Sequence, residues 1–286
     1  MQVLRNLKSS KAAMVTLLAT LAAWSGGAVW AMDLTPTLQG QFVQGGMVVG
    51  QTQPGAQVRL DDQTLQVSPA GEFVFGFGRD ETGTVTLTIE STNNEQWSAS
   101  FVLGERQFDI QRVDGVPQET VTPDEATQQQ ISADAEQVWH ARQPRTDLTY
   151  FAGDFIWPAE GPVTGVYGSQ RILNGEPRAP HYGLDIAADT GSPAYAPASG
   201  VITMTAPDMV LSGGTLIIDH GHGIFSTFLH LDEILVAEGD YVEQGEHIAD
   251  IGATGRATGP HLDWRINWGS VRLDPELVLP PEPERY

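Results

Sequence analysis

The chain has no cysteine among its 286 residues. Disulfide bonds, thiol nucleophiles and attachment of a lipid to a cysteine are therefore all excluded, and each domain must be held together by its own core. No Gly-x-Ser-x-Gly sequence occurs, so the usual local signature of a serine hydrolase is missing. No glycine-rich phosphate loop opens a helix, which leaves nucleotide binding without support.

The chain also has few basic residues. It carries 15 lysine and arginine residues against 36 aspartate and glutamate residues, for a net charge of −21. Both lysines, Lys8 and Lys11, lie near the N-terminus. Because nucleic acids and anionic membrane surfaces are bound through basic faces, this balance argues against both as partners.

The first 31 residues are typical of an export signal. Arg5, Lys8 and Lys11 precede an apolar run at positions 12–24, and small residues near Ala31 suit cleavage after it. The run is shorter than the ~20 residues that span a bilayer, although an uncleaved anchor is the alternative. We therefore expect a periplasmic or secreted protein with no stable membrane insertion after cleavage.

Two β-rich regions follow, so the predicted fold class is mainly β. In residues 32–110 apolar side chains alternate with polar ones, as at Val85, Leu87 and Ile89, with turn residues between the runs. This pattern predicts an immunoglobulin-like β-sandwich that serves as an adaptor or spacer. Residues 151–279 are rich in glycine and proline with short β-type runs, and residues 280–286 form a tail.

Residues 111–150 are predicted to be a linker that contains one helix. Thr122 is the expected N-cap, with Pro123 at the first helical position, and the helix should end before Pro144. An apolar stripe predicts that the helix packs on one of the domains; it comprises Ile131, Ala135, Val138 and Trp139. The alternative is that the helix lies across the functional groove as a cover.

Histidine and aspartate are the residues left that could carry chemistry. His181 and Asp185 are four apart in a segment too rich in glycine and proline for a helix, and both are expected on one side of a strand. In 261–266 alternation places His261, Asp263 and Arg265 on one face and apolar residues on the other. Imidazole and carboxylate groups are ordinary zinc donors, so a metal site is one interpretation and a solvated polar face is the other.

The order of several motifs resembles the lysostaphin/LytM-type zinc metalloendopeptidases, which cut peptidoglycan peptides. The likeness covers about residues 161–275 and rests on these segments: His181-Tyr182-Gly183-Leu184-Asp185, Phe228-Leu229-His230-Leu231 and Thr258-Gly259-Pro260-His261-Leu262. The resemblance implies a β-rich peptidase domain with an open groove. It also implies that His181 and Asp185 are metal ligands and that His230 and His261 are catalytic.

The chain departs from this family at one position. The family's last motif is His-x-His, whose second histidine is the third metal ligand, whereas this chain has Asp263 there. Asp263 can ligate a cation, most simply Zn²⁺, although a second carboxylate favours harder ions such as Mn²⁺. The alternative is a metal-free module that binds peptidoglycan or activates cell-wall hydrolases.

The remaining predictions concern the surroundings of the site. Arg265 is expected to orient Asp263, Tyr167 and Arg171 to line the groove, and His220 to be the reserve ligand. Together these patterns predict a metal-dependent endopeptidase of peptidoglycan peptides, with a cell-envelope protein as a possible partner of the N-terminal module.

Overall fold

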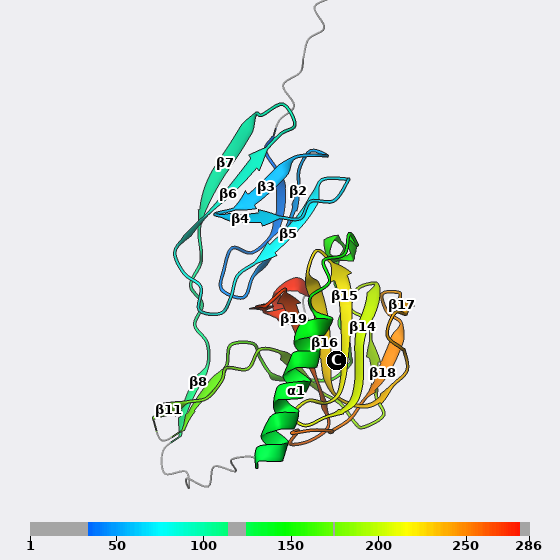
Figure 1. Ribbon diagram of the computed structural model, residues 1–286. Coiled ribbons are helices and arrows are strands. Elements are labelled where there is room, and N and C mark those ends of the chain that lie inside the picture. The colour runs from blue at the N-terminus through cyan, green and yellow to red at the C-terminus, as the bar shows by residue number, and fades with distance from the viewer. Residues whose placement is uncertain (1–33, 114–123, 174, 281–286) are drawn as a thin grey trace, which may run out of the picture. The chain divides into compact units, whose positions relative to one another are not determined.

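The structure is a computed structural model that describes residues 34–113, 124–173 and 175–280 (Figure 1). The predicted export signal and most of the predicted tail lie outside these residues. No helix within them is long and apolar enough to cross a membrane. The described residues after Asp33 belong to one compact unit.

The first seven strands form two antiparallel sheets. One sheet has the order β1-β2-β5 and the other the order β4-β3-β6-β7. In β6 the predicted alternation is present, because Val85, Leu87 and Ile89 are buried while the threonines between them are not. The bounds are β1 Thr37–Gly40, β2 Met47–Gln51, β3 Gln57–Leu60, β4 Gln63–Leu65, β5 Glu72–Gly76, β6 Thr84–Glu90 and β7 Gln96–Val102.

The C-terminal part is built around one large sheet. Its central order is β17-β14-β15-β16-β19-β12-β9; β13 and β18 pair beside β16, and β20 pairs with β19. The bounds are β9 Val163–Gly165, β12 Leu184–Ala187, β13 Pro193–Tyr195, β14 Gly200–Met209, β15 Gly213–Gly221, β16 Ile224–Ile234, β17 Tyr241–Val242, β18 His247–Ile251, β19 His261–Trp268 and β20 Val271–Leu273. Two short 3-10 helices, η1 Tyr150–Ala152 and η2 Pro275–Val278, flank it.

A third sheet joins residues near the predicted domain boundary to the C-terminal part. Strand β8 (Ile110–Val113) pairs in parallel with β10 (Gln170–Leu173), which pairs with β11 (Glu176–Pro177). The segment that follows the sandwich therefore contributes a strand beside the C-terminal sheet.

The two faces of the large sheet carry different side chains. Directly opposed residues of an antiparallel pair share a face. Trp264 faces Leu184 and Phe228, and these three side chains are buried in the main core. Asp263 faces Asp185 and Leu229, so the other face carries the polar residues. Alternation in β19 thus confirms the predicted division between a core face and a face of candidate ligands.

Helix α1 (Glu125–Ala141) lies on the polar face of this sheet. Its Val138 and Ala141 pack on a small apolar cluster that includes Met204, Ile217 and Phe225. Ile217 is paired with Thr227 and Thr227 with Arg265, so this cluster shares the face of Asp263. The predicted packing of the helix on one domain is confirmed, although Trp139 is 57% exposed.

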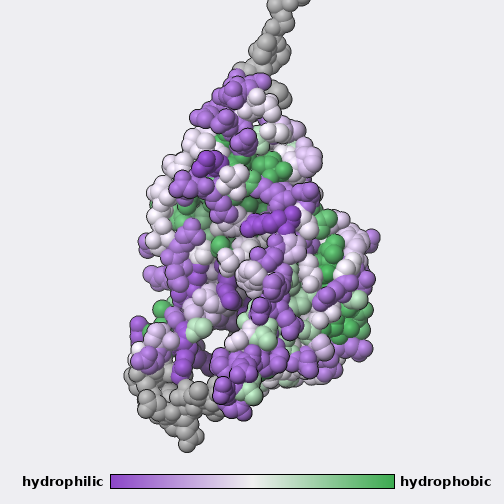
Figure 2. All heavy atoms as spheres, in the orientation of Figure 1, coloured by the Kyte–Doolittle hydropathy of each residue, from purple (hydrophilic) through white to green (hydrophobic). Residues whose placement is uncertain are grey.

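The helix begins later than predicted. Its N-cap is Asp124, whose side chain accepts a hydrogen bond from the backbone N–H of Thr127, so the predicted cap at Thr122 is wrong. An aspartate satisfies a free amide and also places negative charge at the positive end of the helix dipole, which explains the preference. Figure 2 shows that hydrophilic residues cover much of the visible surface, as the acidic composition requires.

Candidate metal centre

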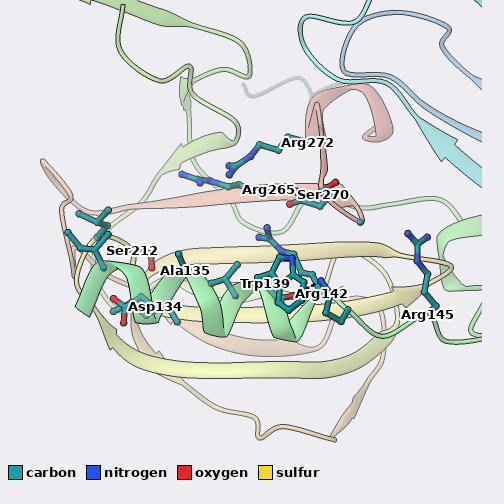
Figure 3. Close-up of a pocket in the computed structure, with 16 residues that line it drawn as sticks. Asp134, Ala135, Trp139, Arg142, Arg145, Ser212, Arg265, Ser270 and Arg272 are labelled. Atoms are coloured by element: carbon teal, nitrogen blue, oxygen red, sulfur yellow. Dashed lines mark hydrogen bonds between the residues drawn. The ribbon is translucent and has the colours of Figure 1, made fainter. Parts of the chain in front are cut away.

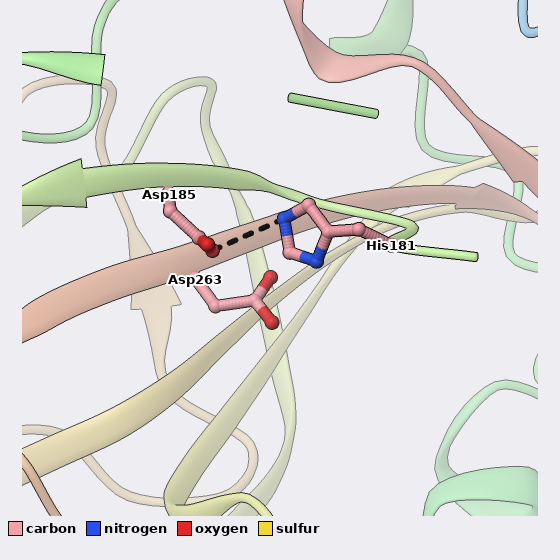
Figure 4. A group of neighbouring side chains, drawn as sticks. All are labelled: His181, Asp185 and Asp263. Carbon is pink, nitrogen blue, oxygen red and sulfur yellow. Dashed lines mark ion pairs between the residues drawn. The ribbon is translucent and has the colours of Figure 1, made fainter. Parts of the chain in front are cut away.

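Three of the predicted ligands converge on the polar face of the large sheet (Figure 4). Asp185 lies on β12 and Asp263 on β19, and the register of these strands places the two residues directly opposite each other. His181 lies in the loop before β12 rather than on a strand, contrary to expectation; its backbone N–H donates to the carbonyl of Ser169. One donor atom from each residue lies within 4.8 Å of the others.

Two atoms of this group are buried without a hydrogen-bond partner. His181 Nε2 and Asp185 Oδ1 are 3.1 Å apart, but their approach lacks hydrogen-bond geometry. A buried polar atom that is left unpaired costs free energy, and native structures rarely tolerate it. Two such atoms side by side, one imidazole nitrogen and one carboxylate oxygen, fit a divalent cation.

Two glycines make room for the carboxylates. A Cβ atom added to Gly183 would lie 1.9 Å from Asp263 Oδ1, and one added to Gly165 would lie 2.2 Å from Asp185 Oδ2. Neither distance is compatible with a side chain at those positions. The carboxylates therefore occupy space that any other residue would fill.

Asp263 is held by Arg265, as predicted. It is 3% exposed, and Arg265 Nε lies 3.0 Å from Oδ1 and 3.1 Å from Oδ2. Burial alone would raise the pKa of Asp263, but the Arg265 guanidinium outweighs it, so the pKa lies below its usual value. Asp263 is thus ionised at neutral pH, and because each carboxylate oxygen has two lone pairs it can face Arg265 and a cation together.

The two carboxylates also act on His181. Burial of the imidazole opposes its protonation, but Asp185 and Asp263 outweigh this effect and raise the pKa of His181. The pocket therefore favours positive charge beside His181. A cation bound there would satisfy the same carboxylates without that proton.

His230 and His261 form a pair beside these donors. Their ring centroids are 4.8 Å apart, and His261 Nε2 lies 4.0 Å from Asp185 Oδ1. Each ring is held through Nδ1, which contacts the carbonyl of Thr254 in His230 and that of Gly259 in His261, both at 2.8 Å. Since a carbonyl only accepts, Nδ1 carries the proton in each ring and a neutral ring keeps a free lone pair on Nε2.

The backbone of His230 is unusual. Its φ is +66°, a left-handed conformation that residues other than glycine seldom adopt and that is found disproportionately at functional sites. Burial lowers the pKa of His230, and the nearby His261 lowers it further. The ring is therefore neutral at pH 7, with Nε2 able to accept a proton.

Two of the residues predicted from sequence lie elsewhere. His220 is fully buried on the core side, where its ring contacts the carbonyl of Ser199 and the hydroxyl of Ser226, so it cannot serve as a reserve ligand. Tyr167 does not line the groove: it is 2% exposed, and its hydroxyl donates to the carbonyl of Arg272. Sequence alternation could not show this, because both positions depend on contacts between distant strands.

A pocket of about 930 Å³ opens onto His181 and Asp185. Arg171 lines it, as predicted from sequence. Arg265, also predicted near the site, lines it too, whereas sequence reasoning missed three further arginines there: Arg178, Arg256 and Arg272. Arginine is no more frequent in residues 151–279 than in residues 32–150, so the sequence carries no signal that could have found them.

This part of the chain is similar to known proteins. Residues 179–275 match the model of peptidase family M23. Peptidoglycan DD-endopeptidase ShyA of Vibrio cholerae is 41% identical over 88 residues, which are 31% of this chain and 20% of that protein. The DD-carboxypeptidase/endopeptidase Mpg of Neisseria meningitidis is 38% identical over 104 residues, 36% of this chain and 24% of that protein.

A solved structure extends the likeness beyond the matched domain. A crystal structure assigned to peptidase M23 from Pseudomonas aeruginosa is 25% identical to this chain and has a TM-score of 0.61. The match covers 83% of this chain and 95% of that structure. The matched segments nevertheless span only about a fifth to a quarter of the curated relatives. Residues 179–275, which carry the candidate ligands, are thus similar in sequence to peptidase family M23.

Proposed function

We propose that the protein is a metal-dependent endopeptidase that hydrolyses peptide bonds of bacterial peptidoglycan. The observation that carries this proposal is the convergence of His181, Asp185 and Asp263, with a buried nitrogen and a buried oxygen that form an ion pair but no hydrogen bond, beside the His230–His261 pair. The names of the relatives ShyA and Mpg, both peptidases, support the same reaction.

His181, Asp185 and Asp263 are the residues that would hold the cation. Zn²⁺ accepts this donor set, and two carboxylates also suit Mn²⁺. When bound, such a cation polarises a scissile carbonyl and makes a nearby water more acidic. Two carboxylates balance the charge of a divalent ion, so we expect zinc to be held less tightly than by a site with two histidines and one aspartate.

The protein's own groups would move the proton. The neutral ring of His230 suits the role of general base, which accepts the proton of the attacking water at Nε2. His261 is placed 4.8 Å away, centroid to centroid, and its free Nε2 can interact with the oxygen that gains charge at the scissile carbonyl. Arg265 orients Asp263 and is not placed to act on substrate from that contact.

The alternative function is binding without hydrolysis, as a peptidoglycan-binding protein or an activator of cell-wall hydrolases. One observation favours it: both oxygens of Asp263 already contact Arg265. In that case the pocket would bind peptide, and the Asp263–Arg265 pair would replace the third metal ligand as a structural contact.

One experiment separates the two functions. The purified protein is assayed for bound metal, and isolated sacculi are assayed for released peptides, with His181→Ala as the control. The proposal expects bound zinc or manganese and peptide release that both disappear in His181→Ala. Metal-free, inactive protein that still binds sacculi would establish the alternative.

The proposed substrate also fits the predicted export of the chain to the periplasm or beyond, where peptidoglycan is found. The N-terminal sandwich would then contact another protein of the cell envelope.

A further inference from the structure

Arginine is concentrated around the groove of this acidic chain. Five arginines line the pocket at His181 and Asp185: Arg171, Arg178, Arg256, Arg265 and Arg272. A second pocket, of about 640 Å³ between α1 and strands β19 and β20, is lined by Arg142, Arg145, Arg265 and Arg272. Arg265 and Arg272 belong to both pockets, so these two residues connect the pocket beside α1 with the pocket at the candidate metal ligands.

Three of these arginines, from three different elements, form a cluster (Figure 3). Arg142, the C-cap of α1, donates through Nη2 to the hydroxyl of Thr227 at 2.6 Å, and Thr227 is paired with Arg265 across β16 and β19. The Arg272 guanidinium lies 4.6 Å from the centre of the Tyr182 ring, and Tyr182 follows His181 in sequence. These contacts fix the cluster of Arg142, Arg265 and Arg272 next to the candidate metal centre.

The cluster has too few negative partners. Asp263 pairs with Arg265, but the described part of the chain provides no ion pair for Arg142 or Arg272. Arg142 Nε is buried and has no hydrogen-bond partner. Burial and the charges of Arg272 and Arg265 lower the pKa of Arg142 to about 9, and burial and Arg265 also lower the pKa of Arg272. The positive charges here repel one another, so an anion would stabilise them.

We propose that Arg142 and Arg272 bind a free carboxylate of the peptide that the enzyme cleaves. This inference rests on the proposed function and narrows its substrate to acidic peptides. Arginine matches a planar carboxylate through two parallel N–H donors, which makes it the natural partner of a peptide carboxylate. Helix α1 is then a wall of the substrate site, because it supplies one of the two binding side chains.

The test measures binding without turnover. The full chain is stripped of metal with EDTA, and its affinity for two synthetic stem tetrapeptides is measured by titration calorimetry. One peptide has free carboxylates and the other carries carboxamides in their place. Since hydrogen bonds to charged groups are stronger than neutral ones, we expect the carboxamide peptide to bind about tenfold more weakly.

Variants locate the effect. Arg272→Gln should bind the carboxylate peptide about tenfold more weakly and the carboxamide peptide almost unchanged. Arg59→Gln, at an exposed site on β3, is the matched loss of one charge and should change neither affinity. If thermal unfolding shows that Arg272→Gln is misfolded, Arg142→Gln is measured in its place.

Equal affinity of the wild-type protein for the two peptides would overturn the proposal, and so would an equal loss for both peptides in the variant. Displacement of the carboxylate peptide by millimolar inorganic phosphate, with no discrimination between the peptides, would show a general anion site and would also overturn it. Because no metal or hydrolysis is involved, a preference for carboxylate would stand even if the protein proved not to be a peptidase.

Discussion

The N-terminal sandwich and the C-terminal sheet use the same alternation of side chains for different ends. In β6 the outward residues are threonines that are partly exposed, and Thr86 simply contacts Ser100 across the pair. In β19 the outward residues include Asp263, which is 3% exposed although it is charged. Burying a charge is costly unless the charge is paired. The buried carboxylate of Asp263 in β19 therefore needs a partner, whereas the partly exposed threonines of β6 do not. In β19 that partner is Arg265, whose Nε lies 3.0 Å from Asp263 Oδ1.

The largest expected effect is a loss of activity on substitution of His230, which lies beside the candidate ligands. In His230→Asn the imidazole is lost, while asparagine tolerates the left-handed backbone at this position. We expect peptide release from sacculi to fall by about 10²–10⁴-fold, the usual contribution of a general base, with the thermal midpoint nearly unchanged. His247→Asn, at an exposed histidine on β18, is the control and should keep full activity. Full activity of His230→Asn would remove His230 from the mechanism.

The next largest effect is a loss of stability at acidic pH, caused by His220 on the core side. Burial lowers the pKa of His220 to about 4, whereas an unfolded histidine titrates near 6.5. Above pH 6.5 the His220 imidazole is neutral in both the folded and the unfolded state, so it causes no loss of stability there. As the pH falls from 6.5 toward 4, the unfolded state takes up a proton before the folded state does. The free energy of unfolding should therefore decrease by up to about 3 kcal/mol over this window.

Urea unfolding measured between pH 4 and pH 8 checks this prediction. In His220→Gln the free energy of unfolding should fall less between pH 6.5 and pH 4, because the titrating imidazole is gone. The variant should also be less stable at every pH, because Ser226 loses its hydrogen-bond partner. An unchanged pH slope in His220→Gln would show that other groups cause the acid sensitivity.

A smaller effect is expected at the glycine that makes room for Asp263. In Gly183→Ala the new Cβ would lie 1.9 Å from Asp263 Oδ1, so the carboxylate must move. We expect metal affinity to fall at least about tenfold, because moving a ligand costs no less than losing a contact that orients one. Gly78→Ala is the control, because the nearest heavy atom to its new Cβ is 3.9 Å away. Competition with a chromogenic chelator measures both; equal affinities would separate Asp263 from metal binding.

Sequence reasoning reached the local features and missed the non-local ones. The alternation in 261–266 predicted that Asp263 and Arg265 share a face, and the structure brings them into contact. The placement of His181 in a loop and the pairing of Asp185 with Asp263 depend on strands about 80 positions apart, which periodicity does not reveal. The resemblance to known peptidases supplied that pairing instead.

The arginine cluster shows the same limit more plainly. Arg142, Arg265 and Arg272 come from a helix and two strands, and no pattern within any of these segments marks them as neighbours. The helix cap was missed for a local reason, because Asp124 competes with Thr122 only two positions away and is the better cap. Tyr167 was misplaced because an aromatic ring in a turn can face either the pocket or the core.

The central claim is that His181, Asp185 and Asp263 hold one cation between them. Anomalous diffraction at the zinc and manganese edges, from crystals grown with metal in excess, tests it most directly. We expect one strong peak in contact with His181 Nε2, an oxygen of Asp185 and an oxygen of Asp263. No peak beside His181, with Asp263 contacting Arg265 alone, would contradict it.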